Sequence, residues 1–298
     1  MTKQLTVFTP SFNRAYLLPN LYNSLVRQTS KDFAWLIVDD GSSDGTEELV
    51  QKWIDENKVE ILYKYQDNLG MHGAHNTAYE LIETELNVCI DSDDYMPDNA
   101  VELILDTWSK NKDDKYAGIL GLDCYKNGQV VSSRKFPEEL KSGKYFELKS
   151  RFGLKGDIKF VYRTDVIKKY PAYPIFKEEK FVPLNYKYLL IDQDYDMLFL
   201  NEFLCVVEYM EDGSSRNIIK QYLKNPKGFE HERKVRMKYA YSLKERFRNA
   251  IHYVSCSIQL KNGRFLSDST NVLLTILAIP LGIALNVYIR TTNRKGWM

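Results

Sequence analysis

Three aspartates within four positions follow a short apolar run in the segment Ile90-Asp91-Ser92-Asp93-Asp94. Side chains two residues apart in an extended chain project to the same side, so Asp91 and Asp93 are expected to face one crevice. Carboxylates at the carboxyl end of a parallel strand form a hard oxygen site suited to Mg²⁺ or Mn²⁺, where open α/β sheets bind ligands. The segment therefore predicts a divalent cation that bridges phosphate oxygens, and a solvated acidic loop before a helix is the alternative.

A second acidic turn follows an earlier apolar run and reads Val38-Asp39-Asp40-Gly41-Ser42-Ser43-Asp44-Gly45-Thr46. Its glycines permit a tight turn, and a carboxylate there can accept hydrogen bonds from the N–H of a pyrimidine or from a ribose hydroxyl. A plain Asx turn into a helix accounts for Asp44 and Gly45, but not for Asp39 and Asp40 together. If both acidic turns follow strands of one parallel sheet, they lie at the same edge and predict a nucleotide site there.

Short apolar runs alternate with helix-spaced apolar residues over the first 120 residues, which is typical of an α/β fold with a mostly parallel sheet flanked by helices. The expected strands are Leu5–Thr9, Ala34–Val38, Val59–Tyr65 and Asn87–Ile90. Helical spacing of apolar residues recurs in residues 18–26, 49–54 and 101–108. This order places each acidic turn directly after a strand.

The pattern weakens in the middle of the chain. Residues 121–175 are interpreted as an irregular region with short strand candidates such as Phe160–Tyr162. A helix is expected after Pro183, followed by two short strands around Asn201.

The C-terminal part is strongly basic, because residues 214–298 hold 16 Lys and Arg against 4 Asp and Glu and carry a net charge of +12, whereas the rest carries −11. Residues 233–254 combine an apolar stripe with a basic face, which predicts one basic amphipathic helix. Residues 272–289 are the most apolar stretch, and as a helix they would reach about 27 Å, short of a hydrocarbon core of about 30 Å. We expect a membrane surface to be bound through residues 233–298, with a re-entrant or in-plane anchor; a buried helical hairpin is the alternative.

Nucleic acid is not an expected partner, because the basic segment has no interleaved aromatics in a sheet, no glycine clamp and no zinc ligands. The four cysteines show no C-x-x-C spacing, which indicates a reducing compartment. Residues 1–18 contain Pro10, Asn13 and Arg14 where a secretory leader would need an apolar core. The expected location is therefore the cytoplasmic face of a membrane, peripheral or monotopic.

These segments occur in the order seen in family-2 glycosyltransferases of the GT-A fold, which the chain resembles from about Leu5 to Asn217. The matching segments are Phe8-Thr9-Pro10-Ser11-Phe12-Asn13-Arg14, the two acidic turns, Asn68-Leu69-Gly70 with His75-Asn76, Glu179-Lys180-Phe181-Val182-Pro183, and Glu208-Tyr209 with Asp212-Gly213-Ser214-Ser215-Arg216-Asn217. The likeness is to bacterial enzymes that build capsule, exopolysaccharide or teichoic-acid glycans. It implies a GT-A catalytic domain over residues 1–213, with a nucleotide-sugar half at 1–120 and an acceptor half at 121–213, followed by a membrane-associating helical extension over 214–298.

The resemblance implies an inverting transfer from a nucleotide diphosphate sugar, expected to be a UDP-sugar, to a hydroxyl of a lipid-linked or polymeric glycan acceptor. The residues that it assigns to the nucleotide sugar are Thr9, Pro10, Asn13, Asp39, Asp40, Asn68, Gly70, Asn76, Asp91, Ser92 and Arg216. It assigns Asp93, together with Asp91, to a Mn²⁺ or Mg²⁺ ion on the diphosphate.

An inverting transfer needs one carboxylate as general base. Where many relatives carry Phe-Val-Pro-Glu, this chain has Leu184 at the last position, so that acid is missing. Glu179 is the first candidate for the base and Glu178 the second, and the alternative is that both are surface acids in a lysine-rich turn. A sugar nucleotidyltransferase, and a membrane-bound sugar-binding module that has lost its base, are the alternative functions.

Overall fold

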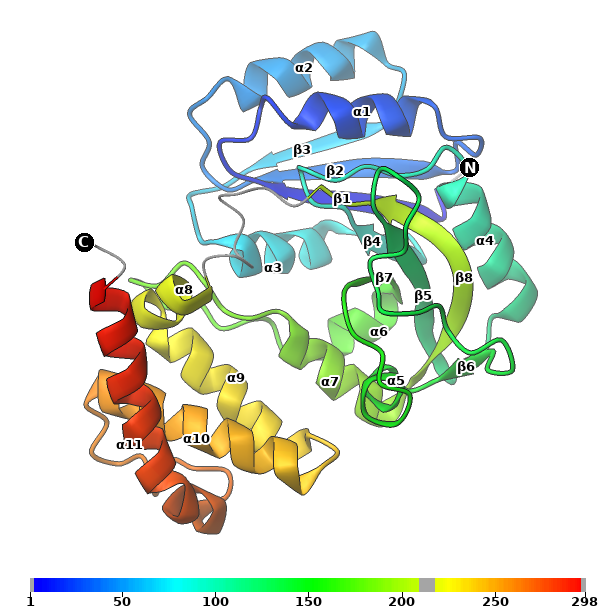
Figure 1. Cartoon of the computed structure of the whole chain (residues 1–298). Coiled ribbons are helices and arrows are strands. Elements are labelled where there is room, and N and C mark those ends of the chain that lie inside the picture. The colour runs from blue at the N-terminus through cyan, green and yellow to red at the C-terminus, as the bar shows by residue number, and fades with distance from the viewer. Residues whose placement is uncertain (1–2, 209–217, 296–298) are drawn as a thin grey trace. The chain divides into compact units, whose positions relative to one another are not determined.

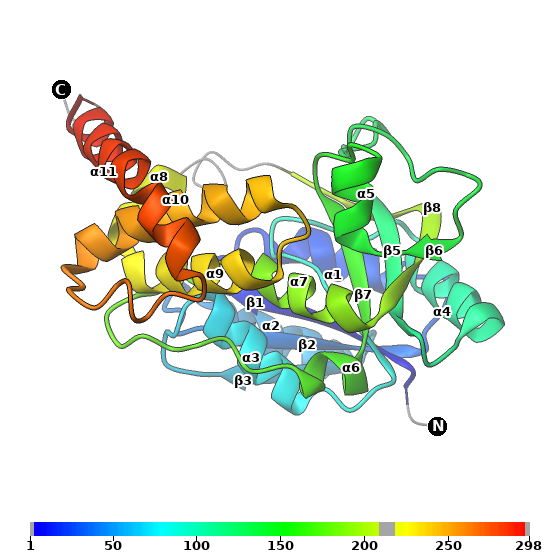
Figure 2. The same cartoon turned by 90° about the horizontal axis from the view of Figure 1, so that it is seen from below.

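The computed structural model describes residues 3–208 and 218–295, which fall into two compact units. The two units are residues 1–172 with 194–210, and residues 173–193 with 211–298. The second unit therefore takes in an internal segment in addition to the C-terminal region that the sequence placed after residue 213. Figures 1 and 2 show the elements of both units.

The first unit is built around a mixed sheet whose described strands lie in the order β3-β2-β1-β4-β7-β5-β8-β6. Their bounds are β1 (Leu5–Ser11), β2 (Phe33–Asp39), β3 (Ile61–Tyr65), β4 (Leu86–Cys89), β5 (Tyr116–Cys124), β6 (Ser142–Gly143), β7 (Ile158–Arg163) and β8 (Asp196–Val206). The ladders β1–β2, β1–β4, β2–β3 and β5–β8 are parallel, whereas β7 is antiparallel to β4 and β5, and β6 to β8. The first four strands thus form the parallel sheet that the alternating pattern predicts.

Helices cover both faces of this sheet, and Figure 1 shows α1 and α2 on one face and α3 on the other. The helices of the first unit are α1 (Leu18–Val26), α2 (Thr46–Glu56), α3 (Met71–Leu81), α4 (Ala100–Asn111), α5 (Tyr145–Arg151) and α6 (Thr164–Lys169). The expected strands and the three expected helical stripes are confirmed, with their ends shifted by at most three residues.

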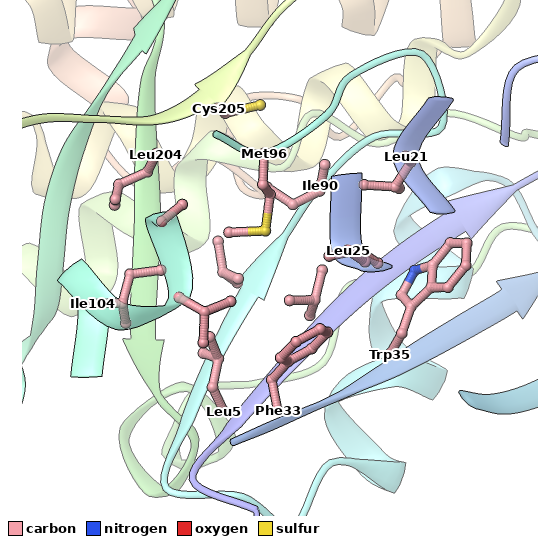
Figure 3. Packing of buried hydrophobic residues seen from close by; sticks show 14 of the residues in the cluster. Leu5, Leu21, Leu25, Phe33, Trp35, Ile90, Met96, Ile104, Leu204 and Cys205 are labelled. Atoms are coloured by element: carbon pink, nitrogen blue, oxygen red, sulfur yellow. The ribbon is translucent and has the colours of Figure 1, made fainter. Parts of the chain in front are cut away.

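A continuous apolar core lies between the sheet and helices α1, α2 and α4. Leu21 of α1 and Ile104 of α4 point into it in the close-up of Figure 3. Beside them Trp35 of β2 stacks with Tyr22 and Trp53, and the ring centroids of Tyr22 and Trp53 are 4.4 Å apart at an interplanar angle of 9°. Burial of one large apolar side chain contributes about 1.5–3 kcal/mol, so this layer anchors the strands whose ends carry the acidic turns.

The middle of the chain is more regular than the sequence predicted, since β5, β7 and β8 run through it. The segment around Asn201 is one strand and not two, so this prediction was wrong. Its register against β5 shifts between Leu120 and Leu122, and the Asn201 amide bonds both the N–H and the carbonyl of Phe136, at 2.8 and 3.0 Å. A bulge therefore accommodates the polar residue without ending the strand.

The second unit is helical in its described residues. Its helices are α7 (Asn185–Asp194), α8 (Ile218–Lys224), α9 (Pro226–Tyr239), α10 (Leu243–Leu260) and α11 (Val272–Lys295). The helix expected after Pro183 is confirmed, but residues 233–254 belong to two helices, so the prediction of one helix was wrong. Ala240 is extended and ends α9, and the Ser242 hydroxyl accepts a hydrogen bond from the N–H of Glu245 as the N-cap of α10.

Three cations of the predicted basic face form ion pairs inside the second unit. Arg233 and Arg236 lie 3.5 and 2.7 Å from the buried carboxylate of Glu232, and Lys234 lies 3.6 Å from Glu230. These side chains therefore support α9 and its neighbours and do not form the open basic face that the sequence suggested.

α11 runs as one helix through Pro280 over 24 residues, a length of about 36 Å. The apolar stretch 272–289 accounts for about 27 Å of this length, as the sequence predicts, and the helix continues past Ile289 through polar residues. By length and composition alone, it is the one helix among the described residues that is long and apolar enough to cross a membrane. Its most apolar 18 residues, which lie within Val272–Thr292, have a mean hydropathy of 2.3, and a third of them are buried within the protein.

Candidate functional site

The turns that follow β1, β2 and β4 lie at one edge of the sheet, because these neighbouring strands are parallel. The last residue of β1, Ser11, pairs with the last residue of β2, Asp39. Since β2 and β4 flank β1, the turns that carry Asp40 and Asp93 are two strand spacings apart, about 10 Å. The two acidic turns therefore lie on the same side of the first unit.

Hydrogen bonds join the turn after β1 to the turn after β2. The N–H of Asn13 donates to Ser42 Oγ at 2.8 Å, and Asn13 Oδ1 accepts from the N–H of Ser43 at 2.9 Å. The N–H of Ala15 donates to Asp44 Oδ2 at 2.9 Å. Burial raises the pKa of Asp44, but this hydrogen bond and others to its carboxylate lower the pKa by a larger amount. The pKa of Asp44 therefore lies below its usual value. The polar residues of the two turns thus hold each other in place.

Asp40 connects the turn after β2 to the segment before α3. Its buried carboxylate accepts hydrogen bonds from Gln66 Nε2 at 2.7 Å, from the N–H of Leu69 at 2.8 Å and from the N–H of Gly70 at 2.7 Å. Gly70 has φ 83° and ψ 166°, a conformation that residues with a Cβ rarely adopt. A carboxylate can accept about four hydrogen bonds, so these three use most of its capacity and Asp40 organises this loop.

Asp39 and Thr9 are also bonded within the protein. The carboxylate of Asp39 accepts from the N–H of Ser42 at 2.8 Å and from the Tyr63 hydroxyl at 2.6 Å. Burial, and then this bond to Asp39, raise the pKa of Tyr63. Thr9 Oγ1 accepts from Trp35 Nε1 at 3.0 Å inside the core. These side chains stabilise the strand ends that carry the turns, and their contacts with a nucleotide stay predictions.

Residues 91–94 form a turn, which is closed by a hydrogen bond of 3.0 Å from the N–H of Asp94 to the carbonyl of Asp91. The extended conformation expected from the sequence is therefore wrong. Asp91 and Asp93 are nevertheless both half-buried, whereas Ser92 and Asp94 are buried. The Asp94 carboxylate accepts from the N–H of Glu208 at 3.1 Å, just beyond β8. Asp94 thus attaches the turn to the segment after β8, and Asp91 and Asp93 remain partly accessible to solvent.

A buried ion pair beside this turn was not predicted from the sequence. Lys159 Nζ of β7 lies 3.8 Å from Asp123 Oδ1 of β5, and the two side chains are 12% and 3% exposed. The pKa of Asp123 is raised to about 6 and that of Asp94 to about 7, because burial raises each by more than the nearby charge of Lys159 lowers it. Burial lowers the pKa of Lys159, but attraction to the surrounding groups, Asp123 first, raises it well above the usual value. A lysine inside the apolar run Ile158–Val161 was the signal that could have revealed the pair.

A family model described as "Glycosyl transferase family 2" matches residues 6–170, more than half of the chain. The chain belongs to this family. The chondroitin synthase of Escherichia coli is 32% identical over 107 residues, which are 36% of this chain and 16% of that protein. A GalNAc(5)-diNAcBac-PP-undecaprenol beta-1,3-glucosyltransferase of Campylobacter jejuni is 28% identical over 153 residues, which are 51% of this chain and 46% of that protein. The family-2 chain therefore spans less than half the length of either relative.

Solved structures support the fold of this family-2 chain. Residues 1–349 of S. aureus TarS in complex with UDP-GlcNAc superpose with a TM-score of 0.60 at 17% identity, covering 98% of this chain and 92% of that chain. The mannosyltransferase PcManGT from Pyrobaculum calidifontis, in complex with GDP-Man and Mn²⁺, gives a TM-score of 0.53 at 16% identity, with 98% and 83% covered. The predicted GT-A fold is thereby confirmed.

The remaining donor residues predicted for the family lie around the same edge or outside the described residues. Pro10, Asn68 and Asn76 are half-buried, in β1, in the turn before α3 and in α3. Gly41, with φ 89°, lies against Asn68, where a Cβ would come within 3.0 Å of the backbone nitrogen. The turns after β2 and β3 pack this closely because residue 41 is glycine. Arg216, together with the rest of its motif, falls outside the described residues.

Glu179, the predicted general base, belongs to the second unit and caps α9. Its buried carboxylate accepts hydrogen bonds from the N–H groups of Lys227 and Gly228, both at 2.9 Å. The first N–H groups of a helix lack partners within the helix and carry partial positive charge, which a carboxylate satisfies. The neighbouring Glu178 is exposed. This capping role was not predicted, because Glu179 lies 48 residues before Lys227 in the chain.

We expect Glu179→Ala to lower the free energy of unfolding by roughly 1–3 kcal/mol, because two N–H groups of α9 lose their acceptor. Urea unfolding followed by circular dichroism measures the change. Glu178→Ala is the matched exposed control and should change the free energy by less than about 0.5 kcal/mol. Equal stability of the two variants would contradict the capping role.

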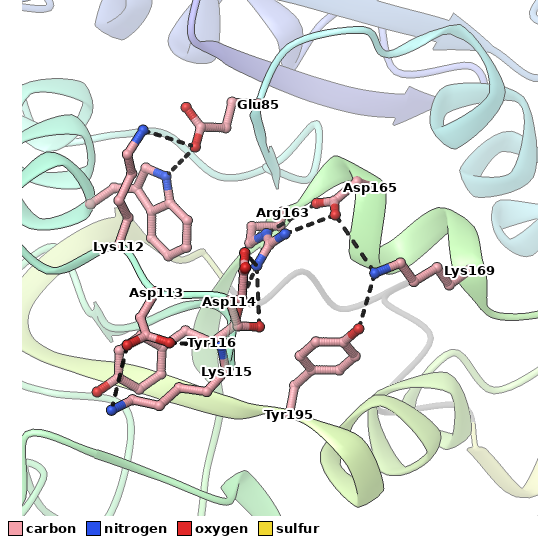
Figure 4. Close-up of polar contacts among 11 residues, drawn as sticks. Glu85, Lys112, Asp113, Asp114, Lys115, Tyr116, Arg163, Asp165, Lys169 and Tyr195 are labelled. Carbon is pink, nitrogen blue, oxygen red and sulfur yellow. Dashed lines mark hydrogen bonds and ion pairs between the residues drawn. The ribbon is translucent and has the colours of Figure 1, made fainter.

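A hollow of about 750 Å³ lies at the opposite edge of the sheet, near the start of β4 and the end of β7. Figure 4 shows that its charged groups pair with one another. Arg163 binds Asp165 at 2.8 Å, Lys112 lies 3.8 Å from Glu85, and Trp108 donates to Glu85 at 2.7 Å. Because these groups are satisfied within the protein and lie away from the acidic turns, the hollow is not the candidate site of this family-2 chain.

Proposed function

We propose that this chain is an inverting glycosyltransferase that moves a sugar from a nucleoside diphosphate sugar, expected to be a UDP-sugar, to a hydroxyl of a lipid-linked or polymeric glycan. The observation that carries the proposal is the common sheet edge at which the turns with Asp40 and Asp93 lie. The family match over residues 6–170 supports it. The TarS and PcManGT structures, which contain UDP-GlcNAc and GDP-Man, support a nucleotide sugar as the donor.

In the proposed step, the acceptor oxygen forms a bond to the anomeric carbon while the bond from that carbon to the diphosphate oxygen breaks. The electron pair of the broken bond leaves with the diphosphate, and the acceptor proton passes to a carboxylate. Glu179 and Glu178 remain the two candidates for this base. Glu178 is the more accessible of the two, because both oxygens of Glu179 accept hydrogen bonds from α9.

The donor set of the acidic turn fits a divalent cation whose coordination is completed by substrate. Among the described residues there is no group of three or more His, Cys, Asp or Glu that could hold a metal. Mg²⁺ at phosphate sites is usually held by one or two carboxylates, and phosphate oxygens and water supply the rest. Asp91 and Asp93 are the accessible carboxylates of the turn, and both suit Mg²⁺ or Mn²⁺. A cation bound there would act as a Lewis acid on the diphosphate.

Incubation with individual nucleotide sugars and Mn²⁺, without acceptor, tests the proposal. We expect slow release of the nucleoside diphosphate from one donor, and a higher melting temperature with that donor, because a ligand that binds the folded state stabilises it by mass action. The screen also identifies the donor sugar. The absence of both stabilisation and release with every UDP-sugar and GDP-sugar would refute the proposed activity.

Two alternative functions make different predictions in the same screen. A sugar nucleotidyltransferase is disfavoured by the family match, and the turn Pro10-Ser11-Phe12-Asn13 after β1 lacks the glycine-rich phosphate loop of that class. A sugar-binding module without a base is suggested by Leu184. Such a module would be stabilised by the donor but would not release the nucleotide, even after acceptor is added.

We also propose that the second unit binds the cytoplasmic face of a bacterial membrane, because the exposed side of α11 is apolar. The buried side of α11 carries Leu274, Ala278 and Ile289 together with Thr275, Gly282 and Asn286, and Asn286 Nδ2 donates to the carbonyl of Ser255 of α10 at 3.0 Å. Its exposed apolar side chains are Val272, Leu273, Ile276, Leu277, Leu281, Ile283, Val287 and Tyr288. A helix on a water-facing surface exposes mainly polar side chains instead. Since α11 packs along α10 through the apolar cluster that contains Leu274 and Ala278 and through the hydrogen bond of Asn286, we propose that it lies in the membrane plane.

Vesicle flotation with phosphatidylglycerol tests this surface. We expect the double variant Leu273→Glu/Leu277→Glu to lower the bound fraction at least about tenfold, because two exposed leucines lose their burial in lipid. Leu81→Glu, which replaces an exposed leucine of the first unit, is the matched control and should bind as the wild type does. Unchanged flotation of the double variant would refute the membrane surface. A concentration-dependent mass in solution would indicate a second copy as the partner of this face.

A further inference from the structure

A buried lysine lies behind the acidic turn and takes no part in the proposed chemistry. Lys159 is the second residue of β7, the strand inserted between β4 and β5 in Figure 1. Because β7 is antiparallel to both neighbours, its first residues lie at the edge where β4 and β5 end. A parallel strand in the same place would put its first residues at the opposite edge. The direction of β7 therefore brings the lysine to the acidic turn.

The surroundings of Lys159 are acidic. Asp123 Oδ1 is 3.8 Å from its ammonium nitrogen, and Asp94 and Asp91 also help to raise the pKa of Lys159. Asp123 pairs with Cys205 in the register of β5 and β8, and the Cys205 thiol lies 3.7 Å from the Asp94 carboxylate, so the two carboxylates lie in the same region. Asp94 and Asp123 are both buried, at 7% and 2% exposure. Carboxylates that are withdrawn from water and close to one another repel strongly unless a cation offsets them. Lys159 supplies such a cation from within the protein.

We infer that Lys159 is a positioning residue of the donor site, whose ammonium group holds Asp94 and Asp123 together and keeps the turn 91–94 in the shape that leaves Asp91 and Asp93 accessible. What the turn binds rests on the proposed function, but the shape of the turn does not. Without this charge the carboxylates move apart. The hydrogen bonds that close the turn, from the N–H of Asp94 to Asp91 and between Tyr95 and Val206, then open more often.

Amide hydrogen exchange tests the shape of the turn without any ligand. We expect Lys159→Met to speed exchange in the peptide 91–96 at least about tenfold, with peptides of β2 unchanged. Lys159→Arg keeps the charge and should stay within about threefold of the wild type. Lys155→Met, which changes an exposed lysine of the same segment, should have no effect. Wild-type protection of residues 91–96 in a folded Lys159→Met variant would overturn the inference.

Calorimetric binding of UDP with Mn²⁺ tests the consequence for the site. We expect Lys159→Met to raise the Kd at least about tenfold and Lys159→Arg to restore most of the affinity. Should Lys159→Met fail to fold, the double variant Lys159→Met/Asp123→Asn removes both charges of the ion pair and is expected to fold. Its Kd for UDP and its exchange in the turn should remain raised, because Asp94 and Asp91 still lack the cation that Lys159 supplies.

The double variant separates positioning from simple neutralisation. A wild-type Kd and wild-type exchange in this variant would mean that Lys159 serves only to neutralise Asp123, and would overturn the inference. A wild-type chain that binds no nucleotide at all refutes the proposed function alone, because the exchange of residues 91–96 still decides the role of Lys159.

Discussion

Asp93→Ala is expected to lower the turnover number at saturating donor and Mn²⁺ by at least about a hundredfold, because a cation on the leaving diphosphate contributes several kcal/mol and each 1.4 kcal/mol is about tenfold in rate. Asp93 is half-buried in its turn. The hydrogen bond that closes the turn joins the N–H of Asp94 to Asp91, and the bond from the N–H of Glu208 goes to the Asp94 carboxylate. The fold should therefore survive the substitution, and the loss should appear in catalysis and in the Mn²⁺-dependent part of UDP binding.

Steady-state kinetics and UDP calorimetry, each with and without Mn²⁺, measure the effect of Asp93→Ala. Asp106→Ala is the matched control, since Asp106 is an exposed aspartate of α4 that pairs with Lys110 at 3.0 Å. The control should keep wild-type turnover. An Asp93→Ala enzyme with wild-type turnover in excess Mn²⁺ would exclude the metal role of this residue.

Asp40→Ala is expected to reduce both stability and nucleotide affinity. The N–H groups of Leu69 and Gly70 and the amide of Gln66 would lose their acceptor, and each buried donor left unsatisfied costs about 1–3 kcal/mol. We expect a loss of about 2–5 kcal/mol in total, which lowers the melting temperature of a domain of this size by roughly 5–15 °C. Since the same loop carries Asn68, affinity for UDP should fall at least about tenfold.

Differential scanning calorimetry and UDP titration measure the two effects of Asp40→Ala. Asp67→Ala changes an exposed aspartate of the same loop and should alter stability by less than about 0.5 kcal/mol. If Asp40→Ala melts within about 2 °C of the wild type, the carboxylate does not organise the loop. If it melts early but binds UDP normally, the loop is not part of the nucleotide site.

The candidate site shows which features can be predicted from the local sequence pattern and which cannot. The two acidic turns could be assigned to one sheet edge from the sequence, because each follows an apolar run and successive parallel strands end at the same edge. The internal partners of Asp40 could not be predicted in this way. Gln66, Leu69 and Gly70 lie 26 to 30 residues further along the chain, and only the folded loops bring their donors to one carboxylate.

The second unit shows the same limit. The apolar and basic residues of 233–254 do recur at helical spacing, but helix α9 ends before Ala240 and helix α10 begins after the N-cap Ser242. The apolar stretch of α11 was recognised from composition. Its orientation was not, because the side that carries Gly282 and Asn286 is defined by contact with Val254 and Ser255 of α10.

By itself, the sequence determined the resemblance to family-2 glycosyltransferases, the strands and helices of residues 5–111 and the position of both acidic turns. These features depend on residue spacing along the chain, which is a local property. Only the tertiary structure decided that β7 enters antiparallel beside β4, with Lys159 behind the acidic turn, and that Glu179 caps a helix 48 residues away. Such contacts depend on which distant segments pair and in which register, and periodicity within one segment carries no information about its partner.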